Sequence, residues 1–332
     1  MSTRRRSPRL SLVQLVKFAV SAHLIAQGSF ILYKLLNSDP NVTLKIRQNA
    51  AAPGVTYSNT TKTETYSRTL KIEDGIEWIS YVPHEPRHET PILMQHGMWH
   101  GAWCWETWQI LLAEAGWESH AISQPGHGRS PTQRPIFACT LDYYLSFIRD
   151  AVNKLPTKPI LMGHSMGGAL TQWYIRYIGD LPGAVLVAPW ALHDGFIDSA
   201  SAFVKLDPVG CVLSSLRWKA DFVRTPEVAA AALLSPDSIY TPEQLYARLN
   251  DESALVMIQH AFWQTPEHHT PMLWLAGEKD AVCPEPAERR SAAAYGAEYV
   301  VIPNAAHNLM MEKNYAEIAE RIITWLDALD VE

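Results

Sequence analysis

Cysteine is scarce in this 332-residue chain, and the few that occur form no C-x-x-C pair. The four cysteines stand far apart, at Cys104, Cys139, Cys211 and Cys283. A structural zinc site of the usual ligand spacing is therefore not supported, and no metal is expected. The thiols are either free or joined in one or two disulfides, and their spacing alone leaves both options open.

After residue 40 the sequence also lacks any basic stripe with interleaved aromatics. The first 38 residues contain six Lys and Arg and no acidic residue, whereas the whole chain carries −6, so the remainder carries −12. An acidic body argues against binding to the phosphate backbone of a nucleic acid. No internal repeat is present, and a composition of 47% hydrophobic and 19% charged residues predicts a folded globular protein.

Residues 1–40 are predicted to form a basic, apolar extension, with a candidate membrane segment at residues 10–36. Three interpretations stay open: a signal anchor, an amphipathic surface helix and a mitochondrial presequence. Two glycosylation sequons follow, at 41–43 and 59–61. A signal anchor would place the rest of the chain in the lumen, where sequons can be used. The alternatives are a mitochondrial or a cytoplasmic location.

Residues 41–64 are rich in Asn, Thr, Ser, Ala and Pro, which is typical of a linker. Residues 65–332 are predicted to form the folded domain. It begins with two strands, 65–72 and 76–82, joined by the turn residues Glu73-Asp74-Gly75.

Short apolar runs then alternate with helical patterns along the folded domain. The runs are at 91–95, 158–162, 184–188, 272–276 and 298–302, and the helical patterns are at 104–115, 141–154, 166–178, 286–295 and 313–329. Such alternation predicts an α/β fold, with a mostly parallel central sheet covered by helices on both faces.

The stretch from about 190 to 268 interrupts this alternation. It contains no clear strand, and prolines divide it into short helical patterns. We expect a helical cap inserted between two strands of the sheet. Its aromatic residues either pack the cap onto the body or line a pocket, and spacing does not separate the two roles.

The residues that indicate chemistry begin at Gly163-His164-Ser165-Met166-Gly167. This G-x-S-x-G pentapeptide is a weak signal alone, but here it directly follows a predicted strand and precedes a helix. A tight strand-to-helix turn exposes the serine hydroxyl and crowds its neighbours, so small residues must flank it. Ser165 is the predicted nucleophile.

A serine hydroxyl needs a base beside it, and His307 is the candidate. Of the thirteen histidines, it is the one that follows the last predicted strand, where a parallel sheet places its loops next to Ser165. Surface, cap or pocket roles are expected for His100, His260, His268 and His269.

The acid that orients this base should follow an earlier strand, and Asp280 lies in the turn after the run at 272–276. Asp194, after the run ending at 188, is the alternative, and Glu278 is less favoured. The backbone N–H groups of Met98 and Met166 are the predicted donors to a developing oxyanion. Candidate substrate-binding residues are Trp99, His164, Trp218 and Trp263.

Five segments together resemble the α/β-hydrolase superfamily, in the order Ser, Asp, His. They are His96-Gly97, Gly126-His127-Gly128-Arg129-Ser130, Gly163-His164-Ser165-Met166-Gly167-Gly168, Gly277-Glu278-Lys279-Asp280 and Ala306-His307. The run from His96 to Trp105 is similar to the subgroup of plant methylesterases and hydroxynitrile lyases. The N-terminal extension departs from the usual plan of that subgroup.

The resemblance implies hydrolysis of a carboxylic ester through an acyl-enzyme, with no metal or organic cofactor. Thioesters, amides and lactones are cleaved by the same chemistry, and the aromatic cap favours an apolar small-molecule or lipid-like substrate. Three other functions stay open: a hydroxynitrile lyase or other enzyme that cleaves C–C bonds, a lipid hydrolase at a membrane, and a non-catalytic binding protein. The oligomeric state does not follow from the sequence.

Overall fold

The computed structural model describes residues 21–22, 25–26, 28–30, 32–33, 39–47, 50–191, 193–260 and 265–329. The chain divides into two units, Met1–Asp39 and Pro40–Glu332. In the first, the described positions between 21 and 33 are helical, and Ile25, Leu32 and Tyr33 are exposed. No helix of the described residues has the length and apolar content needed to cross a bilayer. The candidate segment 10–36 lies largely outside the described residues, so the anchor stays a prediction.

The second unit is built on one nine-stranded sheet with the order β1-β2-β3-β5-β4-β6-β7-β8-β9. β1, β2 and β3 run antiparallel to their neighbours, and β4 to β9 are parallel to one another. The strands are β1 (Val55–Lys62), β2 (Tyr66–Glu73), β3 (Ile76–Pro83), β4 (Ile92–Gln95), β5 (Ser119–Ser123), β6 (Ile160–His164), β7 (Ala184–Val187), β8 (Met272–Gly277) and β9 (Glu298–Ile302). The predicted mostly parallel sheet is confirmed.

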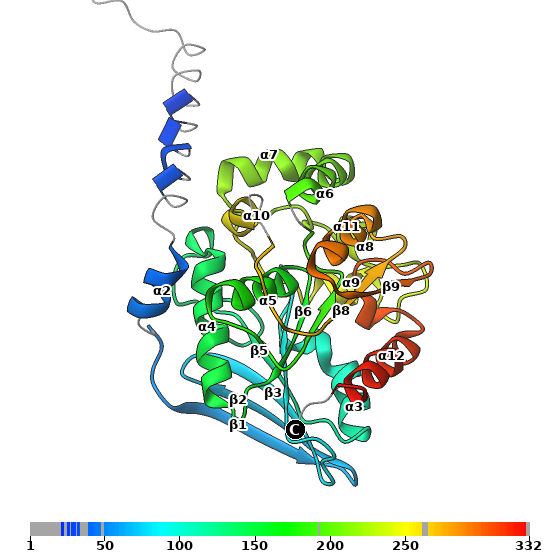
Figure 1. Cartoon of the computed structure of the whole chain (residues 1–332). Helices are drawn as coiled ribbons and strands as arrows, with labels where there is room; N and C mark the ends of the chain where they lie inside the picture. The colour runs from blue at the N-terminus through cyan, green and yellow to red at the C-terminus, as the bar shows by residue number, and fades with distance from the viewer. Residues whose placement is uncertain are drawn as a thin grey trace, which may run out of the picture. The chain divides into compact units, whose positions relative to one another are not determined.

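Helices cover both faces of this sheet, as Figure 1 shows. α3 and α12 pack together on one face, and α4 and α5 pack together on the other. The helices of the second unit are α2 (Pro40–Ile46), α3 (Glu106–Glu114), α4 (Leu141–Lys154), α5 (Met166–Tyr177), α6 (His193–Leu206), α7 (Pro208–Arg217), α8 (Pro226–Leu233), α9 (Pro242–Tyr246), α10 (Leu255–His260), α11 (Glu285–Tyr295) and α12 (Tyr315–Asp327).

The predicted hairpin is formed by β2 and β3. Its turn residues Asp74 and Gly75 have φ angles of +51° and +71°, the left-handed pair that tight two-residue hairpins require. Aspartate tolerates this conformation and glycine adopts it without strain. The Asp74 carboxylate also accepts a hydrogen bond from Gly54 N–H and pairs with Lys154 of α4.

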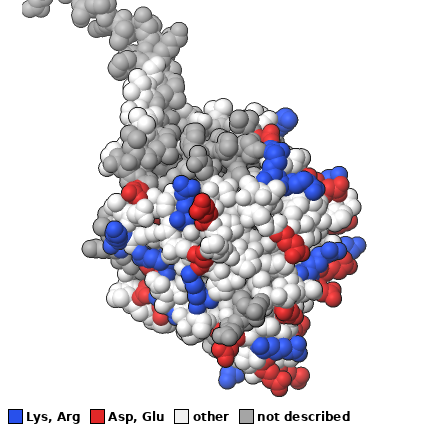
Figure 2. Space-filling model, viewed as in Figure 1, with Lys and Arg blue, Asp and Glu red and all other residues white. Residues whose placement is uncertain are grey.

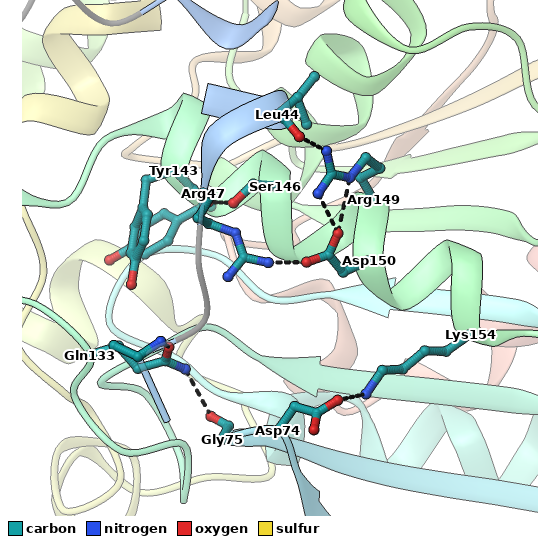
Figure 3. Close-up of polar contacts among 12 residues, drawn as sticks. Leu44, Arg47, Asp74, Gly75, Gln133, Tyr143, Ser146, Arg149, Asp150 and Lys154 are labelled. Atoms are coloured by element: carbon teal, nitrogen blue, oxygen red, sulfur yellow. Dashed lines mark hydrogen bonds and ion pairs between the residues drawn. The ribbon is translucent and has the colours of Figure 1, made fainter. Parts of the chain in front are cut away.

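The predicted linker at 41–64 instead contains α2 and the edge strand β1. The hydrophobic pattern of the sequence did not indicate β1. All eight of its residues are exposed, so apolar and polar side chains do not alternate along the strand. α2 packs on α4, and Figure 3 shows the polar contacts. Arg149 donates to the Leu44 carbonyl and Arg47 pairs with Asp150.

The predicted helical cap corresponds to α6–α10, which lie between β7 and β8 in the chain. No strand occurs among the described residues of this insertion; Lys219 and Ser253 form only an isolated β-bridge. In Figure 1, α6 and α7 lie above the sheet.

Most of the described tryptophans pack in the interior. Trp105, Trp108, Trp117 and Trp274 are among the largest fully buried side chains. Burial of such large apolar groups is a main source of core stability. On the face seen in Figure 2, basic and acidic side chains intermingle, which agrees with the absence of a basic stripe.

Candidate active site

Ser165 occupies a strained turn between β6 and α5. Its φ and ψ angles are +53° and −116°, a conformation that non-glycine residues rarely adopt. The turn is possible only because its neighbours are small. A Cβ on Gly163 would lie 2.2 Å from the Gly167 carbonyl oxygen, and a Cβ on Gly167 would lie 2.2 Å from that of Gln95. The local sequence therefore fixes where the serine side chain emerges.

Asp280 and His307 meet at the carboxyl ends of neighbouring strands. Asp280 follows β8, His307 follows β9, and His307 Nδ1 lies 2.7 Å from Asp280 Oδ2. A carboxylate only accepts hydrogen bonds, so Nδ1 carries the proton and Nε2 keeps its lone pair. The other Asp280 oxygen accepts from the N–H groups of Val282 (2.7 Å) and Cys283 (2.8 Å). The carboxylate is thus held from both sides.

His164 connects this pair to the serine. Its ring centroid lies 4.7 Å from that of His307, and its Nε2 donates to the His307 carbonyl at 3.2 Å. Ser165 is the next residue along the chain. No hydrogen bond joins its hydroxyl to His307 within the described part of the chain. Catalytic hydrogen bonds are often absent or long before substrate binds, so the absence of this hydrogen bond is compatible with Ser165 as the nucleophile and His307 as its base.

Two unengaged backbone N–H groups lie beside Ser165. Met166 is the first residue of α5, so its N–H has no carbonyl partner within the helix. Met98 N–H donates to no atom of the residues described. The loop that carries Met98 abuts the serine, since a Cβ on Gly97 would lie 2.9 Å from Ser165 Cβ. The structure thus brings both predicted oxyanion donors to the nucleophile's turn.

Ser165 forms part of the lining of a narrow cavity. Most of its wall is apolar, and residues from both body and cap contribute. The cavity is lined by Met98, Trp99, Ser165, Trp190, Ala191, Ser199, Phe203, Met257, His260 and Val282. A chamber of this kind favours uncharged, apolar substrate groups over ionised ones.

Of the four predicted substrate-binding residues, Trp99 lines this cavity. His164 is fully buried and contacts His307 instead. Trp218 follows α7 directly and is not among the residues that line the cavity. Trp263 lies outside the described residues. Trp190 and Val282 also line the cavity, although no sequence motif predicted them. Both follow the carboxyl ends of parallel strands, and that position is the signal that could have identified them.

Glu278, His268 and His269, also considered for the site, neither contact the base nor line the cavity. Glu278 is exposed and accepts from Asn304 N–H, so it does not contact the base. The side chain of Asp194 lies outside the described part. His268 donates to the Tyr295 carbonyl and, like His269, is remote from the residues that line the cavity. Among the described carboxylates, Asp280 is the one that contacts His307.

Two buried histidines beside the site are held neutral. His100 Nδ1 donates to the Met98 carbonyl at 2.7 Å, and its Nε2 accepts from Asn308 Nδ2 at 3.0 Å. His260 Nε2 donates to the Ala191 carbonyl at 3.1 Å, and its Nδ1 accepts from Trp173 Nε1 at 3.3 Å. Each ring needs an unprotonated nitrogen to accept. Burial lowers the pKa of each to about 4.

These pKa values predict acid sensitivity. The folded-state pKa is below the unfolded value of about 6.5, so the unfolded chain binds protons that the native chain does not. The free energy of unfolding should fall by roughly 1 kcal/mol per pH unit for each such histidine as pH drops from 6.5 to 4. Urea unfolding across this range measures it. His260→Gln should reduce the slope by one proton, whereas His269→Gln, an exposed control, should not.

One cluster has residue types that can bind a metal. Ligand atoms of Asp280, Cys283 and His307 lie within 4.8 Å of one another. Asp280 and His307 are already hydrogen-bonded to each other, and burial raises the pKa of the Cys283 thiol well above its usual value. The arrangement fits a hydrogen-bonded acid–base pair better than an open ligand set.

All four cysteines are free thiols, so neither possible disulfide is formed.

Comparison with known proteins agrees with this geometry. A model of the α/β-hydrolase family matches residues 92–321. A pFDCC methylesterase of Arabidopsis thaliana is 33% identical over 107 residues, which cover 31% of this chain and 40% of that protein. A pheophorbidase of Raphanus sativus is 30% identical over 108 residues, with coverages of 31% and 40%. The chain thus spans about two fifths of the length of these relatives.

Solved structures match over more of the chain. An esterase from Exiguobacterium antarcticum has a TM-score of 0.58 at 16% identity, covering 78% of this chain and 96% of its own. A monoacylglycerol lipase from Paleococcus ferrophilus has a TM-score of 0.56 at 20% identity, covering 76% and 98%. At these identities the likeness supports the fold alone. The resemblance to the methylesterase subgroup is confirmed, and the chain is a member of the α/β-hydrolase family.

Proposed function

We propose that this chain is a serine hydrolase that cleaves a carboxylic ester of an apolar small molecule through an acyl-enzyme. The observation that carries the proposal is the 2.7 Å contact between Asp280 and His307, at the strand ends next to the strained Ser165 turn. The family and its esterase-like relatives support a hydrolase. The relative that is a methylesterase favours an ester bond as the one that is cleaved.

The chemistry follows in two steps. Ser165 Oγ attacks the ester carbonyl while His307 Nε2 takes the hydroxyl proton, and Asp280 stabilises the imidazolium that forms. The carbonyl oxygen becomes negative and accepts from the N–H groups of Met98 and Met166. The bond to the alcohol then breaks, and His307 gives the proton to the leaving oxygen. Water, activated by His307, attacks the acyl group and releases the acid and free Ser165.

The cavity suggests which substrates are accepted. Ser199 and His260 are the polar side chains in its lining besides Ser165. Both His260 ring nitrogens are already bonded within the protein, so this ring has little capacity to bind a charged substrate group. The walls from Trp99, Trp190 and Phe203 instead favour an aliphatic or aromatic acyl group. A free carboxylate buried in this chamber would be destabilised, because no cationic side chain lines it among the described residues.

A matched ester series tests the proposal. Methyl and p-nitrophenyl esters of uncharged aliphatic and aromatic acids should be hydrolysed, with one acid released per alcohol. Hemiesters of dicarboxylic acids of equal length, which place a carboxylate in the chamber, should have kcat/KM lower by about 100-fold, because an unpaired buried charge costs several kcal/mol. Release of aldehyde and cyanide from cyanohydrins without any acid product would instead indicate a lyase. Ester binding without turnover would indicate a binding protein.

A further inference from the structure

Trp99 has an unusual backbone conformation for a bulky residue. It follows β4 and has a φ angle of +63°, in the left-handed region that favours glycine. Its side chain is 97% buried and forms part of the cavity wall. A strained conformation at such a residue persists only when surrounding contacts hold it. The contacts that hold Trp99 come from the cap.

Two separate cap segments bind Trp99 by hydrogen bonds. The indole Nε1–H donates to the carbonyl of Ala220, between α7 and α8, at 2.9 Å. The N–H of Asn250, between α9 and α10, donates to the Trp99 carbonyl at 2.7 Å. Phe203 of α6 meets the indole edge-on, with ring centroids 6.2 Å apart. One body residue therefore anchors three parts of the cap.

The two cap segments are also joined to each other. Ala220 N–H donates to the Glu252 carbonyl at 2.8 Å, and Lys219 and Ser253 form a β-bridge. Asn250 Oδ1 additionally accepts from Gly128 N–H of the body at 3.0 Å. The cap thus contacts Trp99 as one connected layer and not through an isolated side chain.

Trp99 shares a peptide bond with Met98, whose N–H is the proposed oxyanion donor. The Met98 carbonyl in that bond accepts from His100 Nδ1 at 2.7 Å. His100 Nε2 in turn accepts from Asn308 Nδ2 at 3.0 Å, and Asn308 follows the base His307. The Met98 backbone is therefore held on one side by the loop of the base and on the other by the cap-bound Trp99.

We infer that Trp99 is a positioning residue, which links the seating of the cap to the orientation of the Met98 N–H. The inference rests on the proposed function, since it concerns the oxyanion donor of that reaction. With the cap bound to Trp99, the loop that carries Met98 is held against the nucleophile's turn. Without the indole hydrogen bond, the backbone from Gly97 to Trp99 regains freedom, and the Met98 N–H is aligned only part of the time. The lost alignment should destabilise the transition state, where charge develops on the oxyanion, and should weaken substrate binding little.

Trp99→Phe tests this, because it removes the indole N–H and keeps an aromatic wall. We expect kcat to fall about tenfold, the value of one ordinary hydrogen bond, with KM changed less than threefold. An alkyl boronic acid, which adds to the serine as a charged tetrahedral adduct, should bind about tenfold more weakly. Binding of an uncharged alcohol of the same alkyl length, which presents no oxyanion, should be unchanged.

Trp78→Phe is the matched control. Trp78 is also 97% buried, but it lies on β3 and its Nε1 has no hydrogen-bond partner among the described residues. The Trp78→Phe substitution removes the same ring area as Trp99→Phe but breaks no hydrogen bond, so it should leave kcat unchanged. If Trp99→Phe does not fold, benzothienylalanine at position 99, in which sulfur replaces only the N–H, should give the same tenfold loss.

The outcomes distinguish failure of the role proposed for Trp99 from failure of the proposed function. A higher KM with unchanged kcat would show that Trp99 is only a wall of the cavity, and unchanged values of both would also overturn the inference. Ser165→Ala, measured in parallel, must abolish turnover. If it does not, the proposed function itself fails, whereas loss of turnover in Ser165→Ala with no effect in Trp99→Phe would overturn only the role of Trp99.

Discussion

Replacement of Ser165 by alanine is expected to lower kcat/KM for ester hydrolysis by about 10⁴- to 10⁶-fold. Without the hydroxyl no acyl-enzyme forms, and only the oxyanion donors and substrate binding remain to assist direct attack by water. The fold should persist. Alanine keeps the Cβ that already tolerates the strained turn, and the lost hydroxyl makes no hydrogen bond to His307 in the described residues.

Initial rates and urea unfolding of the same Ser165→Ala preparation measure both parts of this expectation. Ser215→Ala is a suitable control, because that hydroxyl lies on the exposed side of α7 and bonds only the Cys211 carbonyl. It should retain wild-type rates. Turnover within tenfold of wild type in Ser165→Ala would show that another group is the nucleophile.

Replacement of Asp280 by asparagine should lower kcat by about 10⁴-fold. The amide oxygen can still accept from the N–H groups of Val282 and Cys283, so the loop should keep its shape. The amide nitrogen then faces His307 Nδ1 and donates to it. That exchange favours the tautomer with the proton on Nε2, which leaves the imidazole unable to accept a proton from Ser165.

Asp194→Asn is the matched comparison, because Asp194 follows the neighbouring strand β7 and was the alternative acid. Steady-state rates on one ester should show Asp194→Asn close to wild type. A larger loss in Asp194→Asn than in Asp280→Asn would exchange their roles and would show that the contact at 2.7 Å is structural.

The sequence predicted those parts of the fold that depend on local pattern. β4, β6, β7 and β8 were predicted because their residues are all buried and form short apolar runs. β5 is equally buried, but its sequence SHAIS contains three polar residues, so no apolar run indicated it. The turn at Ser165 was found because the glycines on either side are needed wherever backbone segments approach this closely. Asp280 and His307 were ranked first because loops after parallel strands gather at one edge of the sheet.

The parts that were not predicted depend on tertiary contacts. β1 is polar and fully exposed, so only its pairing with β2 defines it as a strand. The cap aromatics could not be sorted by spacing, and the structure places Phe203 but not Trp218 at the cavity. The neutral state of His100 follows from two hydrogen-bond partners over 200 residues apart in the chain, Met98 and Asn308. No local pattern contains that information.

If His307 and Asp280 make the hydroxyl of Ser165 reactive, a fluorophosphonate should label this serine. The adduct is located by mass spectrometry of the digested protein. We expect one adduct, on Ser165, whose rate of formation falls at least a hundredfold in His307→Ala. An adduct on another residue, or an undiminished rate of labelling in His307→Ala, would contradict this mechanism.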